Sequence, residues 1–183
     1  KINLKHDVVK NNKFDINKTN ANNWQKSILS HALIGEKKAF ERLDFFIKNG
    51  LKNYKDGRNF PSLDNVSRLA PNFHFGEISP NKVWYTVVNN KKNENTDHFL
   101  SELGWREFSN HLLYHFPQFI YENLQKKFDG FPWKNDGIAL KKWQKGLTGF
   151  PLVDAGMREL WQTGSMHNRL RMVVGSFLVK NLL

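Results

Sequence analysis

The sequence predicts an all-α fold, and three features of the chain lead to that prediction. Apolar residues recur at spacings of three and four positions, which is the period of a helix. No stretch alternates apolar and polar residues as a half-buried strand does, and no glycine-rich dinucleotide turn is present. Hydrophobic residues make up 39% and aromatic residues 14% of the 183-residue chain, so we expect one packed helical domain.

Local start and stop signals bound the predicted helices. Gly50 follows the first strongly periodic stretch, and Pro117 ends the longest one. Ser79 is an N-cap ahead of Pro80, and Gly164 is a C-cap. The predicted helices cover about residues 24–33, 36–48, 80–88, 97–116, 138–145, 151–163 and 165–183, with irregular segments at 51–76, 89–96 and 128–137.

The composition favours some partners and excludes others. A net charge of +11 and an isoelectric point near 9.8 favour a polyanion, with nucleic acid ahead of an anionic membrane surface. The absence of Cys excludes disulfides and Cys-ligated metals, and the pair His111 and His115 lacks a third ligand, so no metal site is predicted. The longest apolar run near the end, residues 172–179, is too short to span a bilayer. We expect a cytoplasmic monomer without a membrane partner.

The predicted helix 97–116 places three chemically different side chains on one face. Glu102, Trp105 and Arg106 lie at i, i+3 and i+4. An indole can stack on a base, a carboxylate can accept hydrogen bonds, and a guanidinium can neutralise a phosphate. The spacing alone favours a different interpretation, an amphipathic helix with an ordinary Glu102–Arg106 ion pair.

Two further segments carry polar groups suited to phosphates. Arg169 and Arg171 lie in the first turns of the last predicted helix, beside Asn168 and Met172, and helix N-termini favour anions. A solvated helix start explains the same pattern about as well. The irregular segment 54–70 offers hydroxyls, backbone N–H groups and arginines that can surround a phosphate.

Other notable residues in the last third of the chain have a structural interpretation. Asp154 and Arg158 lie at i and i+4, which predicts an ion pair within one helix. Trp143 and Trp161 are expected in the core.

Four stretches, taken together and in order, resemble one known family. They are VSRLAPNFHFGEISP (66–80), LSELGWREFSNHLLYHFP (100–117), FPW (131–133) and the run from WQKGLTGFPLVDAGMREL to the end (143–183). They are similar to the flavin domain of bacterial class I photolyases. The resemblance covers residues 36–183 and implies an all-α, FAD-binding helical domain of the photolyase/cryptochrome type, with FAD in a folded form beside a positively charged DNA groove. Residues 1–35 would then be a connector from an N-terminal antenna domain carrying a folate or deazaflavin pigment.

The resemblance also implies roles for individual residues. Cofactor binding is implied for Tyr54, Val66, Ser67, Arg68, Leu69, Ala70, Phe99, Arg106 and Arg171. Contact with DNA is implied for Arg58, Glu102, Trp105, Arg106, Asn168 and Arg169. Catalytic roles facing the lesion are implied for Glu102, Trp105, Asn168 and Met172, and an electron-transfer role for Trp133.

The function implied is light-dependent repair of UV-damaged DNA, in which excited reduced FAD donates an electron that splits a cyclobutane pyrimidine dimer. Two alternatives stay open: a cryptochrome-like blue-light photoreceptor, and a flavin-free helical fragment that binds nucleic acid. Val66 and Ala70 stand where the family usually has hydroxyl side chains. The chain also stops before the family's acidic flavin-facing segment, so we expect a C-terminally truncated domain with only part of the cofactor pocket.

Overall fold

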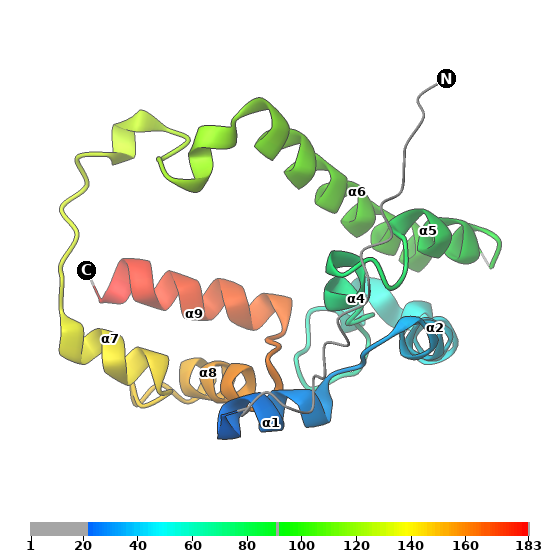
Figure 1. Ribbon diagram of the computed structural model, residues 1–183, viewed down its shortest axis with the longest axis horizontal. Coiled ribbons are helices and arrows are strands. Elements are labelled where there is room, and N and C mark those ends of the chain that lie inside the picture. Colours follow the sequence, from blue (N-terminus) through cyan, green and yellow to red (C-terminus); the bar gives the residue numbers. More distant parts are fainter. Residues whose placement is uncertain (1–21, 91, 183) are drawn as a thin grey trace, which may run out of the picture.

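The computed structural model describes residues 22–90 and 92–182, and the regular structure in these ranges is entirely helical. The predicted all-α fold is therefore confirmed. The helices form two lobes, which a long arch connects; the arch runs from α6 across the top of Figure 1 to α7. Residues 1–21, which hold most of the predicted connector, lie outside the described residues.

The first lobe packs its helices around one aromatic centre. Phe46 is fully buried, and its ring lies 4.7 Å from that of Phe99 and 5.7 Å from that of Tyr54. Aliphatic residues of α5 and α6 complete this core, including Val83, Val87 and Leu103. The elements of the lobe are α2 (Glu36–Phe45), η2 (Phe46–Gly50), η3 (Leu51–Asn53), α3 (Tyr54–Gly57), α4 (Ala70–His74), α5 (Pro80–Val88) and α6 (Glu94–His115).

The second lobe is smaller and consists of α7 (Gly137–Gln144), α8 (Pro151–Thr163) and α9 (Asn168–Asn181), with α1 (Asn23–His31) packed against α8. Gly156 lets α8 and α9 approach closely, because a Cβ built there would lie 3.0 Å from a methyl group of Val174. Ser27 of α1 donates a hydrogen bond to the carbonyl of Gln162 at 2.9 Å. Part of the predicted connector thus packs as a helix on this lobe, and its connecting role stays a prediction.

The arch consists of the end of α6 and the segment that follows it, with η4 (Pro117–Ile120) and η5 (Lys126–Phe128). Every residue from 113 to 135 is exposed. The first half of α6 behaves differently, because Phe99 and Leu100 belong to the core of the first lobe. One continuous helix therefore has a packed half and a solvated half.

Several predicted boundaries are wrong by a few residues. Helix α6 begins at Glu94 and not at residue 97, because the side chain of Asn93 caps it by accepting from the Thr96 N–H at 3.1 Å. Helix α9 begins three residues later than residue 165, because His167 is its N-cap. Segment 51–76 was expected to be irregular but contains η3, α3 and α4. Within the part of the chain that the structure describes, no helix combines the length and apolar character needed to cross a membrane.

Candidate functional site

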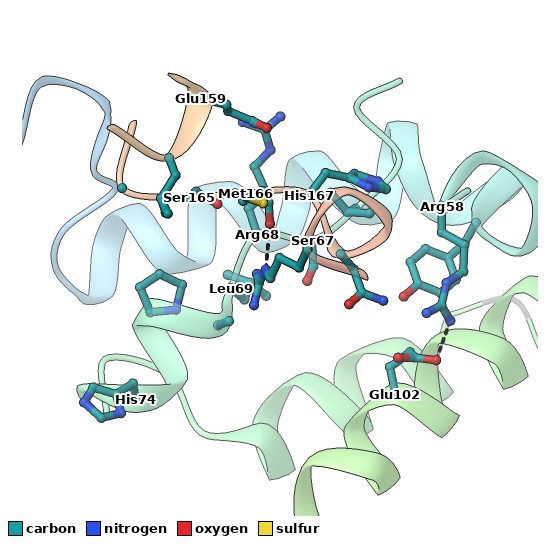
Figure 2. Close-up of a pocket in the computed structure, with 18 of the residues that line it drawn as sticks. Arg58, Ser67, Arg68, Leu69, His74, Glu102, Glu159, Ser165, Met166 and His167 are labelled. Atoms are coloured by element: carbon teal, nitrogen blue, oxygen red, sulfur yellow. Dashed lines mark hydrogen bonds and ion pairs between the residues drawn. The ribbon is translucent and has the colours of Figure 1, made fainter. Parts of the chain in front are cut away.

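A cleft of about 730 Å³ lies between the two lobes. Its volume falls within the range of about 300–1,000 Å³ that is usual for small-molecule and cofactor sites. The residues predicted from the sequence that line it are Tyr54, Arg58, Val66, Ser67, Arg68, Leu69, Ala70, Glu102, Asn168 and Arg171. Segments far apart in the chain, at residues 54–70 and 164–171, therefore meet here, as Figure 2 shows.

One wall of the cleft is a loop that Arg42 of α2 holds in place. The Arg42 guanidinium donates to the backbone oxygens of Ser67 at 2.9 Å and Val66 at 2.7 Å, and to both carboxylate oxygens of Asp64. The hydrogen bonding of Arg42 to the Asp64 carboxylate holds the pKa of Asp64 below its usual value. Arg68, the next residue along, has a positive φ of 56°, which is unusual for a residue other than glycine and is common at functional sites.

A second wall is formed where α3 meets α6. The Arg58 guanidinium forms an ion pair with Glu102, drawn as a dashed line in Figure 2, and it lies 5.3 Å from the centre of the Tyr54 ring. The hydrogen bond to Glu102 raises the pKa of Arg58. Burial raises the pKa of Tyr54 to about 12, so its phenol stays neutral at physiological pH. The predicted ion pair between Glu102 and Arg106 is wrong, because Arg106 instead pairs with Glu107 at 2.8 Å.

The third wall is the start of α9, where His167 caps the helix. Its Nδ1 accepts from the Arg169 backbone N–H at 3.2 Å, and its Nε2 is buried with no hydrogen-bond partner among the described residues. Burial, together with the nearby charges of Arg68, Arg169 and Arg171, lowers the pKa of His167, although Glu159 opposes the shift. The capping imidazole is therefore neutral near pH 7, among three cations.

Other predicted site residues lie outside the cleft. Trp105 is 62% exposed on α6, with its ring 5.7 Å from that of Phe108. Trp133 is exposed in the arch, and Met172 is exposed on α9. Phe99 is buried behind Tyr54, with the two ring centroids 5.3 Å apart, so it supports the cleft wall from the core. The roles predicted for these residues stay predictions.

Arg106 and Arg169 also lie outside the cleft lining. Arg106 lies over the Phe73 ring at 5.7 Å, and Arg169 donates two hydrogen bonds to Asn59. The sequence interpretation missed Asn59, His167 and several lining residues. The available signal for His167 was its position in the sequence, directly before the polar residues that begin α9. The further lining residues not predicted are Pro71, His74, Phe75, Glu159, Leu160, Gly164, Ser165 and Met166.

The lining suits a ligand that has both phosphates and flat rings. Arg68 and Arg171 offer positive charge, and Ser67 offers a hydroxyl donor. Tyr54 and Leu160 offer apolar and aromatic surface. These groups fit a dinucleotide such as FAD. Among residues 22–90 and 92–182, no group of three or more His, Asp or Glu side chains could hold a metal ion.

Comparisons with known proteins agree with this chemistry. A family model described as the FAD binding domain of DNA photolyase matches residues 99–183. A deoxyribodipyrimidine photo-lyase of Agrobacterium fabrum is 45% identical over 163 residues, which is 87% of this chain and 34% of that protein. Cryptochrome-2 of Arabidopsis thaliana is 40% identical over 159 residues, which is 81% of this chain and 26% of that protein.

A solved structure gives the same result in three dimensions. The crystal structure of a bacterial class III photolyase from Agrobacterium tumefaciens aligns with a TM-score of 0.83 at 45% identity, and the alignment covers 87% of this chain and 34% of that one. The chain spans about a third or less of the length of the curated relatives it matches.

Proposed function

Because this chain belongs to the photolyase/cryptochrome family, as part of its FAD-binding helical domain, we propose that it works in light-dependent repair of cyclobutane pyrimidine dimers in DNA. One observation carries the proposal. Glu102 lines the cleft, and Trp105, one turn further along α6, stands exposed at 62%. A ligand in the cleft and a base stacked on Trp105 would therefore contact neighbouring positions of the same helix.

The cleft residues would hold the cofactor. Arg68 and Arg171 would bind its phosphates, Ser67 would donate a hydrogen bond, and Tyr54 would pack against it through a neutral ring. When bound, reduced FAD supplies light-driven electron donation, which is the chemistry that splits a cyclobutane ring. The protein's own contribution is to position the two partners and to hold the Arg58 guanidinium in place through its ion pair with Glu102.

The DNA would contact the side of the cleft where charge and aromatic surface are exposed. Trp105 would stack on the extruded lesion, Met172 would contact it, and Arg169 would bind a phosphate of the backbone. Extruding a dimer costs less than extruding a normal pair, because a damaged pair stacks poorly. The net charge of +11 would strengthen the attraction to DNA of any sequence.

A photoreceptor function is the second candidate, and one observation favours it. Two of the relatives are named cryptochromes, Cryptochrome-2 of Arabidopsis thaliana and Cryptochrome-1 of Sinapis alba, and each is 40% identical to this chain. Against this candidate, a signalling protein would not need the lesion contact that we propose for Trp105. The class I interpretation stays a prediction, because a solved structure at 45% identity is described as class III.

The proposal includes several further expectations taken from the sequence. We expect a monomer, a cytoplasmic location, and UV-damaged DNA as the partner. We also expect a folate or deazaflavin antenna pigment, held by polypeptide other than these helices. Trp133, exposed in the arch, would receive or pass on electrons between the flavin and the solvent.

The first experiment measures bound flavin and repair on the purified chain. The chain is denatured, and released flavin is quantified by absorbance and fluorescence. UV-irradiated oligonucleotide is then incubated with the chain and a reductant, in blue light or in the dark. Loss of dimers in the light but not in the dark supports repair. Bound flavin without repair favours the photoreceptor, and absence of flavin with retained DNA binding favours the flavin-free module.

Trp105→Ala tests the predicted stacking role against a matched control. Stacking on an aromatic side chain is worth about 1–3 kcal/mol per base, so the preference for dimer-containing over intact duplex should fall by about that amount. Phe108→Ala, on the next turn of α6 and also exposed, should leave the preference unchanged. Equal losses of affinity for damaged and intact DNA would contradict the assigned role.

A further inference from the structure

Asn59 links the two lobes beside the cleft, next in the chain to the lining residue Arg58. Its Oδ1 accepts two hydrogen bonds from Arg169, one from Nε at 2.9 Å and one from Nη2 at 2.6 Å. Asn59 follows α3 in the first lobe, and Arg169 lies in the first turn of α9 in the second. The other hydrogen bonds between the lobes within the described ranges 22–90 and 92–182 involve only Leu33 and Gly35, in the segment that connects α1 to α2.

The amide of Asn59 is fixed in this orientation from behind. Its Nδ2 donates to the carbonyl of Lys55 at 3.3 Å, and its backbone N–H donates to the carbonyl of Asp56 at 3.0 Å. The oxygen therefore faces Arg169. On the far side, Nη1 of Arg169 contacts the sulfur of Met172 at 3.6 Å. The guanidinium is held in one position between two neutral groups.

The neutrality of this contact distinguishes Arg169 from other arginines nearby. Arg42, Arg58 and Arg106 each pair with a carboxylate of their own lobe. In the part of the chain that the structure describes, no carboxylate oxygen lies within 4 Å of the Arg169 guanidinium nitrogens. An amide oxygen accepts hydrogen bonds from a guanidinium and so orients it, but unlike a carboxylate it does not cancel the positive charge.

We propose that Asn59 is a positioning residue for Arg169: its neutral oxygen holds the guanidinium beside the cleft and leaves the full positive charge available to a DNA phosphate. The inference rests on the proposed function, because it supposes that DNA approaches this side of the cleft. It adds a residue that touches neither cofactor nor lesion, and it explains why the contact between the lobes is made by an amide.

The test compares Asn59→Asp with Asn59→Leu in the purified chain. Affinity for a short duplex, with and without one thymine dimer, is measured over a series of salt concentrations. Asn59→Asp keeps the acceptor and adds a charge, so the slope of log K against log salt should become shallower by about one unit, as when one phosphate contact is lost. Affinity for damaged and intact duplexes should fall alike, because a phosphate contact carries no sequence information.

The Arg169→Gln background shows whether Asn59→Asp acts through Arg169 or through a general effect of the added negative charge. In that background Asn59→Asp should change the slope no further, since its target is already absent. Asn49→Asp, the same charge change at an exposed position of the first lobe, should leave the slope of the unmutated chain as it was. A slope lowered equally by Asn49→Asp, or lowered again in the Arg169→Gln background, would overturn the proposal.

A second measurement tests the positioning itself without DNA. The Nε–H signal of Arg169 in a proton–nitrogen NMR spectrum should be protected from solvent exchange in the unmutated chain and in Asn59→Asp. In Asn59→Leu the protection should be lost. An unprotected Arg169 signal in the unmutated chain overturns the inference, whatever the DNA measurements give. A protected signal in a chain that binds no DNA would instead refute the proposed function, and with it the role of Arg169 in binding a phosphate.

Discussion

In the first lobe, Phe46, Val83 and Val87 are wholly buried, whereas in the second lobe Phe150, Leu152 and Met172 are all more than half exposed. The buried cluster of the first lobe draws on η2, α3, α5 and α6, while that of the second comes almost entirely from α8 and α9. Buried apolar area is the main source of stability, at about 25 cal/mol per Å². The first lobe is therefore the stable scaffold, and the second depends on a few close contacts.

The difference has a consequence for the cleft between the lobes. Its first-lobe walls are fixed from the core outward, since Tyr54 packs on Phe46 and Arg42 holds the loop at residues 66–67. Its second-lobe wall, the start of α9, is held by fewer contacts. We expect motion of the cleft to come mainly from the second lobe.

The largest expected effect comes from emptying the first core. Phe46→Ala should lower the free energy of unfolding by about 3–5 kcal/mol, because a large fully buried ring is replaced by a cavity. Phe177→Ala, which removes a partly buried ring from the second lobe, should cost clearly less. Denaturant unfolding followed by circular dichroism measures both, and equal losses would show that the two lobes are packed alike.

A substitution with a smaller expected effect tests the contact between α8 and α9. Gly156→Val should cost about 1–3 kcal/mol, because the added atoms meet Val174 and Leu170. Gly104→Val is the matched control, since it is also helical but has open space around its Cβ position. If the two variants were equally stable, the close approach of α8 and α9 would contribute nothing to the second lobe.

The attachment of α1 to α8 can be weakened at Gly164. This residue has a φ of +70°, and a Cβ would lie 2.8 Å from a methyl group of Ile28. Gly164→Ala should cost about 1–2 kcal/mol from the left-handed backbone and should also loosen α1. Gly149→Ala carries a similar backbone penalty without the contact, so proteolysis within α1 should increase in the first variant alone.

The smallest expected effect is a pH dependence of the free energy of unfolding, which arises in the first lobe. Arg42 lowers the pKa of Asp64 in the folded chain, so their interaction stabilises the fold above the unfolded pKa of about 4 and is lost as the pH falls through the lower folded value. Because Asp64 is about half exposed, we expect a contribution below about 1 kcal/mol. The free energies of unfolding of the unmutated chain and of Asp64→Asn should differ at pH 7 and converge as the pH falls below the folded pKa of Asp64.

Local signals in the sequence predicted much of the fold. The hydroxyl of Ser79 accepts from the Lys82 N–H at 3.0 Å, as its N-cap assignment required, and α8 ends at the left-handed Gly164 as expected. Such caps act within one turn, so sequence alone reveals them. Helices α3 and α4 were missed because each is about one turn long and is stabilised by packing rather than by its own sequence.

Contacts between distant residues were harder to predict. The Asp154 carboxylate accepts from the backbone N–H groups of Thr148 and Gly149 instead of pairing with Arg158, which donates to the Gly146 carbonyl at 3.1 Å. Trp161, predicted to be in the core, is 52% exposed. The cleft residues were identified through family resemblance, because no periodicity brings residues 58 and 102 together. The contact between Asn59 and Arg169, 110 positions apart, left no signal in the sequence.

The uneven burial of α6 should be visible in the rate at which its amides exchange with deuterium. Phe99, Leu100 and Leu103 tie the first half of the helix to the core, so exchange there requires the lobe itself to open. Beyond Gly104 the helix is solvated on nearly all sides, and fraying from its end suffices for exchange. A single uninterrupted helix would then show slow protons before Gly104 and fast protons after it, close to Glu102, where the helix borders the cleft.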